Sequence, residues 1–207
     1  MFPGESETED LLRRAAMGDE AARGFLLDLH RARLRQMVAV RMDRRLAARQ
    51  DPSDIVQEAL ADASEKLETY LKDRPIPFYP WLRRLAEERL IHSYRRNVKA
   101  AIRTVDLERP LYHVLPDGSV WSIAQHLAAS ATGPLTALER KQTIRKVQDA
   151  LNRLKDEDRE VIVLRYVEEL PFAEVAAALG IGLQAAKMRH LRALQRLRPL
   201  LDDPHAR

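Results

Sequence analysis

The chain has 207 residues, of which 45% are hydrophobic and 32% are charged, and this balance is typical of a folded, helix-rich protein. It contains no cysteine, which excludes disulfides, thiolate metal sites and cysteine nucleophiles. No run approaches about 18 apolar residues and the chain begins with an acidic, polar stretch. We therefore expect a cytoplasmic protein with neither a membrane span nor a secretory signal.

The first half of the chain is expected to hold three helical segments. Residues 9–42 are rich in Ala, Leu and Arg and have an irregular apolar face. The motif Asp51-Pro52-Ser53 favours a helix start, because Pro in the first turn costs no hydrogen bond, and this helix is expected to run to about Leu71. A proline-rich elbow over residues 74–80 precedes a third helix over residues 81–101.

Helical periodicity fades over residues 104–134, where Pro and Gly indicate a linker with one short helix near residues 122–129. Further helices are expected from residue 135 and over residues 156–167. The run Val161-Ile162-Val163 has strand propensity, but a lone strand has no partner here, so a helix is favoured. The sequence thus predicts an all-α protein with two small helical domains, residues 1–103 and 135–207, joined by the linker 104–134.

A helix-turn-helix is predicted between residues 170 and 197. Apolar residues recur at i, i+3, i+4 and i+7 of its first helix: Phe172, Val175, Ala176 and Leu179. Gly180 supplies the turn, because a residue without Cβ enters the left-handed conformation at little cost. The second helix, residues 183–198, carries five cations and no anion, and such a helix can enter the major groove of DNA. The alternative is an ordinary helical hairpin with a solvated basic face.

Several motifs occur in the order and spacing found in one bacterial protein family. They are Gly18-Asp19-Glu20-Ala21-Ala22, Asp54-Ile55-Val56-Gln57-Glu58, Trp81-Leu82, Tyr94-Arg95-Arg96 and Leu179-Gly180-Ile181. With a linker in the matching place, the chain resembles an RNA polymerase sigma factor of the extracytoplasmic-function group, the compact type with two conserved domains. The resemblance implies that the chain binds core RNA polymerase and directs promoter-specific initiation. Many relatives are also inhibited by an anti-sigma factor, although no residue of this sequence identifies one.

For residues 51–73 the resemblance implies docking on the clamp helices of the largest polymerase subunit. This stretch holds seven acids against two lysines, a balance of −5. An acidic helix face beside exposed apolar residues suits a basic protein groove rather than DNA. The alternative is a surface helix whose acids only keep it soluble. The residues expected to contact polymerase are Asp54, Ile55, Gln57, Glu58, Ala61 and Asp62.

For residues 81–103 and the elbow before them, the resemblance implies contact with the minus-ten promoter element as its strands separate. This helix has seven cations against two acids, or +5. Cations can follow the phosphates, while an aromatic loop can receive an unstacked base. Trp81 is expected to anchor the core instead, because it starts the amphipathic helix. The residues expected at the minus-ten element are Phe78, Tyr79, Arg89, His92, Ser93, Arg95, Arg96 and Lys99.

The second helix of the helix-turn-helix is expected to read the minus-thirty-five element as duplex DNA, and by resemblance its domain rests on the flap of the second-largest polymerase subunit. Arg can pair with guanine and Gln with adenine, whereas Met and Ala offer apolar contact. His190 is also expected to face the groove, while Ala186 and Leu191 are expected in the core. The residues expected at this element are Gln184, Ala185, Lys187, Met188, Arg189, Arg192 and Arg196.

No catalytic site, metal site or cofactor is predicted. The six histidines are scattered and none lies in an HExxH spacing. The sequence has neither a Gly-rich phosphate loop nor a Gly-x-Ser-x-Gly elbow. Two other interpretations stay open: a stand-alone helix-turn-helix regulator with an N-terminal sensing or dimerisation domain, and a helical adaptor whose basic faces bind acidic proteins.

Overall fold

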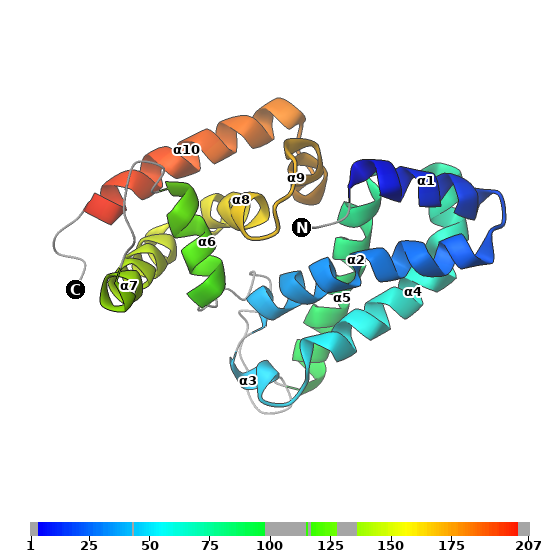
Figure 1. Ribbon diagram of the computed structural model, residues 1–207, viewed down its shortest axis with the longest axis horizontal. Helices are drawn as coiled ribbons and strands as arrows, with labels where there is room; N and C mark the ends of the chain where they lie inside the picture. Colours follow the sequence, from blue (N-terminus) through cyan, green and yellow to red (C-terminus); the bar gives the residue numbers. More distant parts are fainter. Residues whose placement is uncertain (1–3, 43, 98–114, 116, 128–135, 203–207) are drawn as a thin grey trace. The chain divides into compact units, whose positions relative to one another are not determined.

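The computed structural model describes residues 4–42, 44–97, 115, 117–127 and 136–202, and all regular structure in these residues is α-helical (Figure 1). The chain divides into two compact units, unit 1 with residues 1–108 and unit 2 with residues 109–207. The predicted all-α fold with a C-terminal helix-turn-helix is confirmed.

The described residues of unit 1 form five helices: α1 (Glu5–Ala16), α2 (Glu20–Arg41), α3 (Arg44–Ala47), α4 (Pro52–Asp73) and α5 (Phe78–Asn97). Helices α2, α4 and α5 pack on one another, and α1 packs on α2 and α4. Leu26, Leu34 and Met37 of α2 are fully buried between them, as are Ile55 of α4 and Ala86 of α5. Burial of this apolar surface is the main force that holds the unit together.

The segment predicted as one helical stretch over residues 9–42 is two helices. Gly18 has a φ of +90°, a conformation that interrupts the chain of helical hydrogen bonds. Asp19 then begins α2, because its carboxylate accepts a hydrogen bond from the backbone N–H of Ala22 at 3.0 Å. The helix expected to begin at the Asp51-Pro52-Ser53 motif is α4, where Asp51 and Asp54 form a reciprocal capping box.

The proline-rich elbow is shorter than predicted, because α5 begins at Phe78 rather than Trp81. Arg74 ends α4 in the left-handed conformation, and the Tyr70 hydroxyl donates a hydrogen bond to the carbonyl of Ile76 at 2.9 Å. This bond fixes the loop against α4 and directs the first turn of α5 into the core.

Unit 2 contains α6 (Asp117–Leu127), α7 (Ala137–Arg153), α8 (Asp156–Tyr166), α9 (Phe172–Leu179) and α10 (Leu183–Asp202). Helix α8 includes the run Val161-Ile162-Val163, which is helical as expected and fully buried. Helix α10 packs on α7, α8 and α9.

Helix α6 falls inside the predicted linker but packs on α7 and α8. Its Val120, Ile123 and Ala124 are buried, and the Ser122 hydroxyl donates to the carbonyl of Tyr166 at 3.0 Å. Residues 117–127 are therefore part of unit 2 and not a free tether. The sequence predicted the short helix but not its packing.

Candidate nucleic-acid interface

The turn between α9 and α10 has the geometry that the sequence predicted. Gly180 lies in the left-handed region with a φ of +63°. The backbone N–H of Ile181 donates to the carbonyl of Ala176 at 3.0 Å, and the N–H of Gly180 donates to that of Ala177 at 3.3 Å. These bonds satisfy carbonyls that the end of α9 would otherwise leave unpaired. The turn then starts α10 at a defined angle to α9.

One side of α10 holds the helix in unit 2. Ala186, Ala193 and Leu197 are fully buried, and Ala186 is thus in the core as expected. Leu191, which was also expected in the core, is exposed. It lies five residues after Ala186 and two before Ala193, so the turn of the helix carries it to the opposite side.

The solvent-exposed side of α10 brings together most of the residues expected at the minus-thirty-five element. The side chains exposed there are Gln184, Ala185, Lys187, Met188 and Arg192. Amide, guanidinium and apolar groups are therefore available together on one helix face. Such groups can bind phosphates and base edges.

Arg189 and Arg196 differ from these residues, because acids at the start of α8 contact them. The guanidinium of Arg196 forms an ion pair and hydrogen bond with Asp158, whose side chain is buried. Arg189 lies 4.0 Å from a carboxylate oxygen of Glu157. Both arginines therefore flank the exposed face, and Arg196 also ties α10 to α8.

The structure corrects the position of His190, which does not face a groove. Its Nε2 lies 3.0 Å from the Tyr166 hydroxyl, and its ring packs edge-on against Phe172 with 5.3 Å between ring centroids. Burial, with a smaller effect of the Arg165 charge, lowers the pKa of His190 below its ordinary value. This histidine joins α10 to α8 and α9.

Phe78 and Tyr79 are also corrected, because their rings do not form an open stacking surface. They are 3% and 1% exposed, since α5 begins at Phe78 and its first turn enters the core. Both rings pack against His30 of α2. Trp81, expected as a core anchor, is partly buried and stacks on Tyr70 with 4.5 Å between centroids.

Ile55 and Ser93 are two further corrections. Ile55 is fully buried within unit 1 and has no surface for polymerase. Ser93 is buried, and its hydroxyl donates to the side-chain carbonyl of Gln50. Both positions are adjacent in sequence to exposed ones, but successive residues of a helix point about 100° apart, so one can face the core while its neighbour faces solvent.

The acidic and basic surfaces predicted separately on α4 and α5 meet in the structure. Arg89 donates two hydrogen bonds to the Asp62 carboxylate, and its guanidinium lies 3.7 Å from a Glu58 oxygen. Arg96 lies 3.9 Å from the other oxygen of Glu58. The Arg89 hydrogen bond lowers the pKa of Asp62. Two residues assigned to polymerase and two assigned to DNA thus form one ion-pair cluster.

The remaining residues expected to bind in unit 1 lie at the surface. Gln57 and Ala61 are exposed on α4, and His92 and Arg95 are exposed on α5. Asp54 is exposed, and its carboxylate accepts from the backbone N–H of Asp51 at 3.3 Å, so it also caps α4. Lys99 lies outside the described residues.

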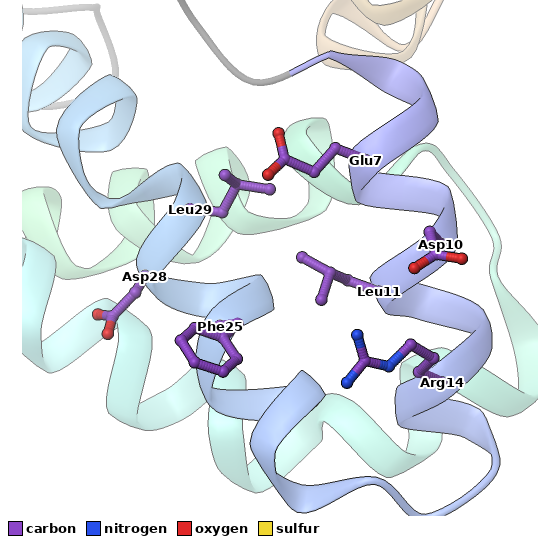
Figure 2. A pocket seen from close by; sticks show the side chains of 7 residues that line it. All are labelled: Glu7, Asp10, Leu11, Arg14, Phe25, Asp28 and Leu29. Carbon is purple, nitrogen blue, oxygen red and sulfur yellow. The ribbon is translucent and has the colours of Figure 1, made fainter.

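A groove of about 380 Å³, which was not predicted from the sequence, lies between α1 and α2. Figure 2 shows Leu11 of α1 facing Phe25 and Leu29 of α2, with Arg14 at one end and Asp28 pointing away. Phe25 is highly exposed. The exposure of Phe25 could not be predicted from its position in an arginine-rich helix, because it depends on where α1 packs against α2.

Two kinds of feature are absent from the described residues. None of the helices there is long and apolar enough to cross a membrane. Those residues also contain no group of three or more His, Asp or Glu side chains placed to hold a metal ion.

Two family matches cover most of both units. Residues 29–100 match Sigma-70 region 2, which includes most of α2 and all of α4 and α5. Residues 150–199 match Sigma-70 region 4, which includes α8, α9 and most of α10. The cationic helices α5 and α10 therefore belong to different conserved regions, region 2 and region 4 respectively.

Similar proteins extend the likeness over nearly the whole chain. The chain is 30% identical to RNA polymerase sigma factor NccH of Alcaligenes xylosoxydans xylosoxydans over 96% of both chains. It is 25% identical to the ECF RNA polymerase sigma factor SigW of Bacillus subtilis over 93% of this chain and 95% of SigW. Among solved structures, CnrH in complex with the cytosolic domain of CnrY aligns with a TM-score of 0.55 and 25% identity, covering 95% of this chain and 97% of CnrH.

Proposed function

Because this chain belongs to the sigma-70 family of RNA polymerase sigma factors, in the extracytoplasmic-function group, we propose that its two helical units share promoter recognition. The protein directs RNA polymerase in transcription initiation and is a non-enzymatic subunit. Its partners are accordingly core polymerase and promoter DNA. The cytoplasmic location expected from the sequence is part of the proposal, because the chromosome is there.

In unit 2, the proposal assigns α10 to the minus-thirty-five element as duplex. The observation that carries it is the exposed face of α10, where Gln184, Lys187, Met188 and Arg192 stand on the helix that follows the left-handed Gly180 turn. A helix placed in this way can lie in the major groove. Arg189 and Arg196 at its flank would then contact phosphates. By family resemblance, unit 2 also rests on the flap of the second-largest subunit.

In unit 1, the proposal assigns the second half of α5 to the minus-ten element. His92 and Arg95 are exposed there, and Arg89 and Arg96 are partly open to solvent beside them. Cations on one helix can follow the phosphates of a separated strand. Phe78, Tyr79 and Ser93 are not included, because they are buried.

The clamp helices of the largest polymerase subunit are proposed to contact α4. Gln57 and Ala61 are exposed there, with Asp54 and Glu58 one turn apart on the same helix. Asp62 is assigned a different role, because it holds Arg89. An acidic helix face of this kind complements a basic protein surface.

A protein inhibitor is a further part of the proposal. CnrH is solved in complex with the cytosolic domain of CnrY, and CnrH aligns with nearly all of this chain. An anti-sigma factor that covers the polymerase-binding surface would keep the protein inactive. The stand-alone regulator predicts instead tight DNA binding without polymerase.

The deciding experiment is transcription in vitro with purified core polymerase on a genomic DNA library, with starts mapped. We expect defined starts with core enzyme and this protein together, and none with either alone. Ala61→Arg should abolish co-purification with core, whereas Ala32→Arg, the same change at an exposed position of α2, should not. Equal polymerase binding by both variants would reject the proposal that α4 contacts the clamp helices. The absence of any transcription start would reject the proposal that the two units recognise a promoter.

A further inference from the structure

Two large apolar side chains are exposed on the basic helix α10. Met188 and Leu191 are 45% and 46% exposed. Single exposed apolar residues are ordinary, but a cluster on one helix face indicates a binding partner. Met188 and Leu191 are three residues apart and therefore neighbours on the helix surface.

These two side chains lie at the centre of the face that the proposed function aims at DNA. Gln184 is four residues before Met188, and Arg192 is four residues after it, so the three residues form one row. Leu191 stands beside that row. The buried residues Ala186, Ala193 and Leu197 occupy the opposite side.

The arginines best suited to guanine are displaced from this centre. Arg196 is paired with Asp158, and Arg189 faces Glu157, so acids of α8 draw both guanidinium groups toward one flank. The centre thus offers the apolar groups of Met188 and Leu191 between Gln184 and Arg192. In the major groove, the apolar feature of a base edge is the C5-methyl group of thymine.

We propose that Met188 and Leu191 read thymine methyl groups in the minus-thirty-five element, so that apolar contact supplies part of its base specificity. The inference rests on the proposed function of α10 and adds the chemical feature that it recognises. Duplex DNA is the occupant that fits best, because the surrounding helix carries five cations and no anion between residues 183 and 198. That charge attracts phosphates on both sides of the apolar centre.

The test uses the full chain bound to core polymerase and a promoter duplex selected by this holoenzyme from a genomic library. Each thymine of the upstream element is replaced in turn by deoxyuridine, which lacks only the methyl group. We expect affinity to fall roughly fourfold at one or two positions, the change that matches loss of one buried methyl-sized group. Deoxyuridine in flanking DNA outside both promoter elements should have no effect.

Variants link the methyl groups to side chains. Met188→Ala and Leu191→Ala should each weaken binding to the thymine duplex and remove the penalty for deoxyuridine at one position. Leu138→Ala changes another leucine of unit 2, 67% exposed on α7, and should leave both affinities unchanged.

Two results would overturn the inference while leaving the proposed function intact. One is a selected element without thymine, or one in which every deoxyuridine substitution is silent. The other is a Met188→Ala variant that keeps its deoxyuridine penalties and loses only binding to a protein, which would make this surface a protein-docking site. If Arg192→Ala also leaves promoter binding unchanged, the assignment of α10 to DNA fails as well.

Discussion

Buried polar side chains determine how unit 1 responds to acid. His30 of α2 is buried against Phe78 and Tyr79, and its Nε2 lies 3.2 Å from the Thr8 hydroxyl of α1. Burial, with a smaller effect of the nearby Arg33 charge, lowers its pKa from 6.5 to about 4. The folded unit therefore holds this ring in its neutral form.

This lowered pKa predicts that unit 1 loses stability in mild acid. Below its usual pKa of 6.5 the histidine of the unfolded chain binds a proton, while the folded form does not until the pH reaches about 4. The free energy of unfolding should thus fall by up to about 3 kcal/mol between these pH values. Urea unfolding followed by Trp81 fluorescence in a Trp121→Phe background measures it.

The matched variants for this prediction are His30→Gln and His92→Gln. Removing the buried ring should flatten the pH dependence, whereas removing the exposed His92 of the same unit should not. An unchanged slope in His30→Gln would show that other groups cause the loss of stability.

Arg159 of unit 2, like His30 of unit 1, has a structural role that was not predicted from the sequence. It is buried, and its guanidinium donates to the carbonyls of Leu151 at 2.8 Å, Asn152 at 3.1 Å and Leu154 at 3.4 Å. These carbonyls lie at the end of α7, where the last carbonyls of a helix lack i+4 N–H partners, although that of Leu151 also accepts from the backbone N–H of Leu154 at 3.2 Å. An arginine in an acidic stretch looks like a surface residue until the next helix packs over it.

We predict that Arg159→Met destabilises unit 2 by about 2–4 kcal/mol, because buried carbonyls lose charge-assisted hydrogen bonds. Arg145→Met, the same change at an exposed position of α7, should change stability by less than about 0.5 kcal/mol. Urea unfolding followed by Trp121 fluorescence, with Trp81 replaced by Phe, compares them. Similar midpoints for the two variants would contradict the structural role of Arg159.

At the scale of helices, the start of α4 and the turn before α10 could be predicted from nearby residues, whereas the exposure of individual side chains could not. The Asp51-Pro52 start of α4 and the Gly180 turn follow from capping and from φ, which depend on residues close in sequence. The burial of Phe78 and Tyr79 and the pairing of Arg89 with Asp62 depend on how α4 and α5 pack. A single sequence shows the charge of each helix but not which charges meet.

The helix-turn-helix itself gives an element-scale prediction. A Cβ at Gly180 would meet nothing within 4 Å, so Gly180→Ala should cost only the left-handed backbone conformation, about 1–2 kcal/mol. Gly182 also has open space around it but no positive φ, so Gly182→Ala is the matched control and should cost less than about 1 kcal/mol. Unfolding of unit 2, followed by Trp121 fluorescence, gives the difference. Equal losses would mean that the turn tolerates a side chain.

At the scale of the whole molecule, the two conserved regions place cationic helices on separate folded units. Arg95 of α5 and Arg192 of α10 are both exposed, and they belong to units 1 and 2 respectively. Under the proposed function each contacts DNA at a different promoter element. One chain that holds two modest contacts binds more tightly than either contact alone, because the second binding event is intramolecular.

Salt dependence can show whether both units contact DNA at once. Each phosphate contact adds close to one to the slope of log affinity against log salt, since a neutralised phosphate releases a counterion. Arg95→Ala and Arg192→Ala should each reduce the slope of the holoenzyme on its promoter by about one, and the double variant by about two. Filter binding between low and moderate salt measures the slopes. If the double variant matches either single one, the arginine that adds nothing to the slope makes no phosphate contact, and simultaneous contact of both units with DNA through these two arginines is refuted.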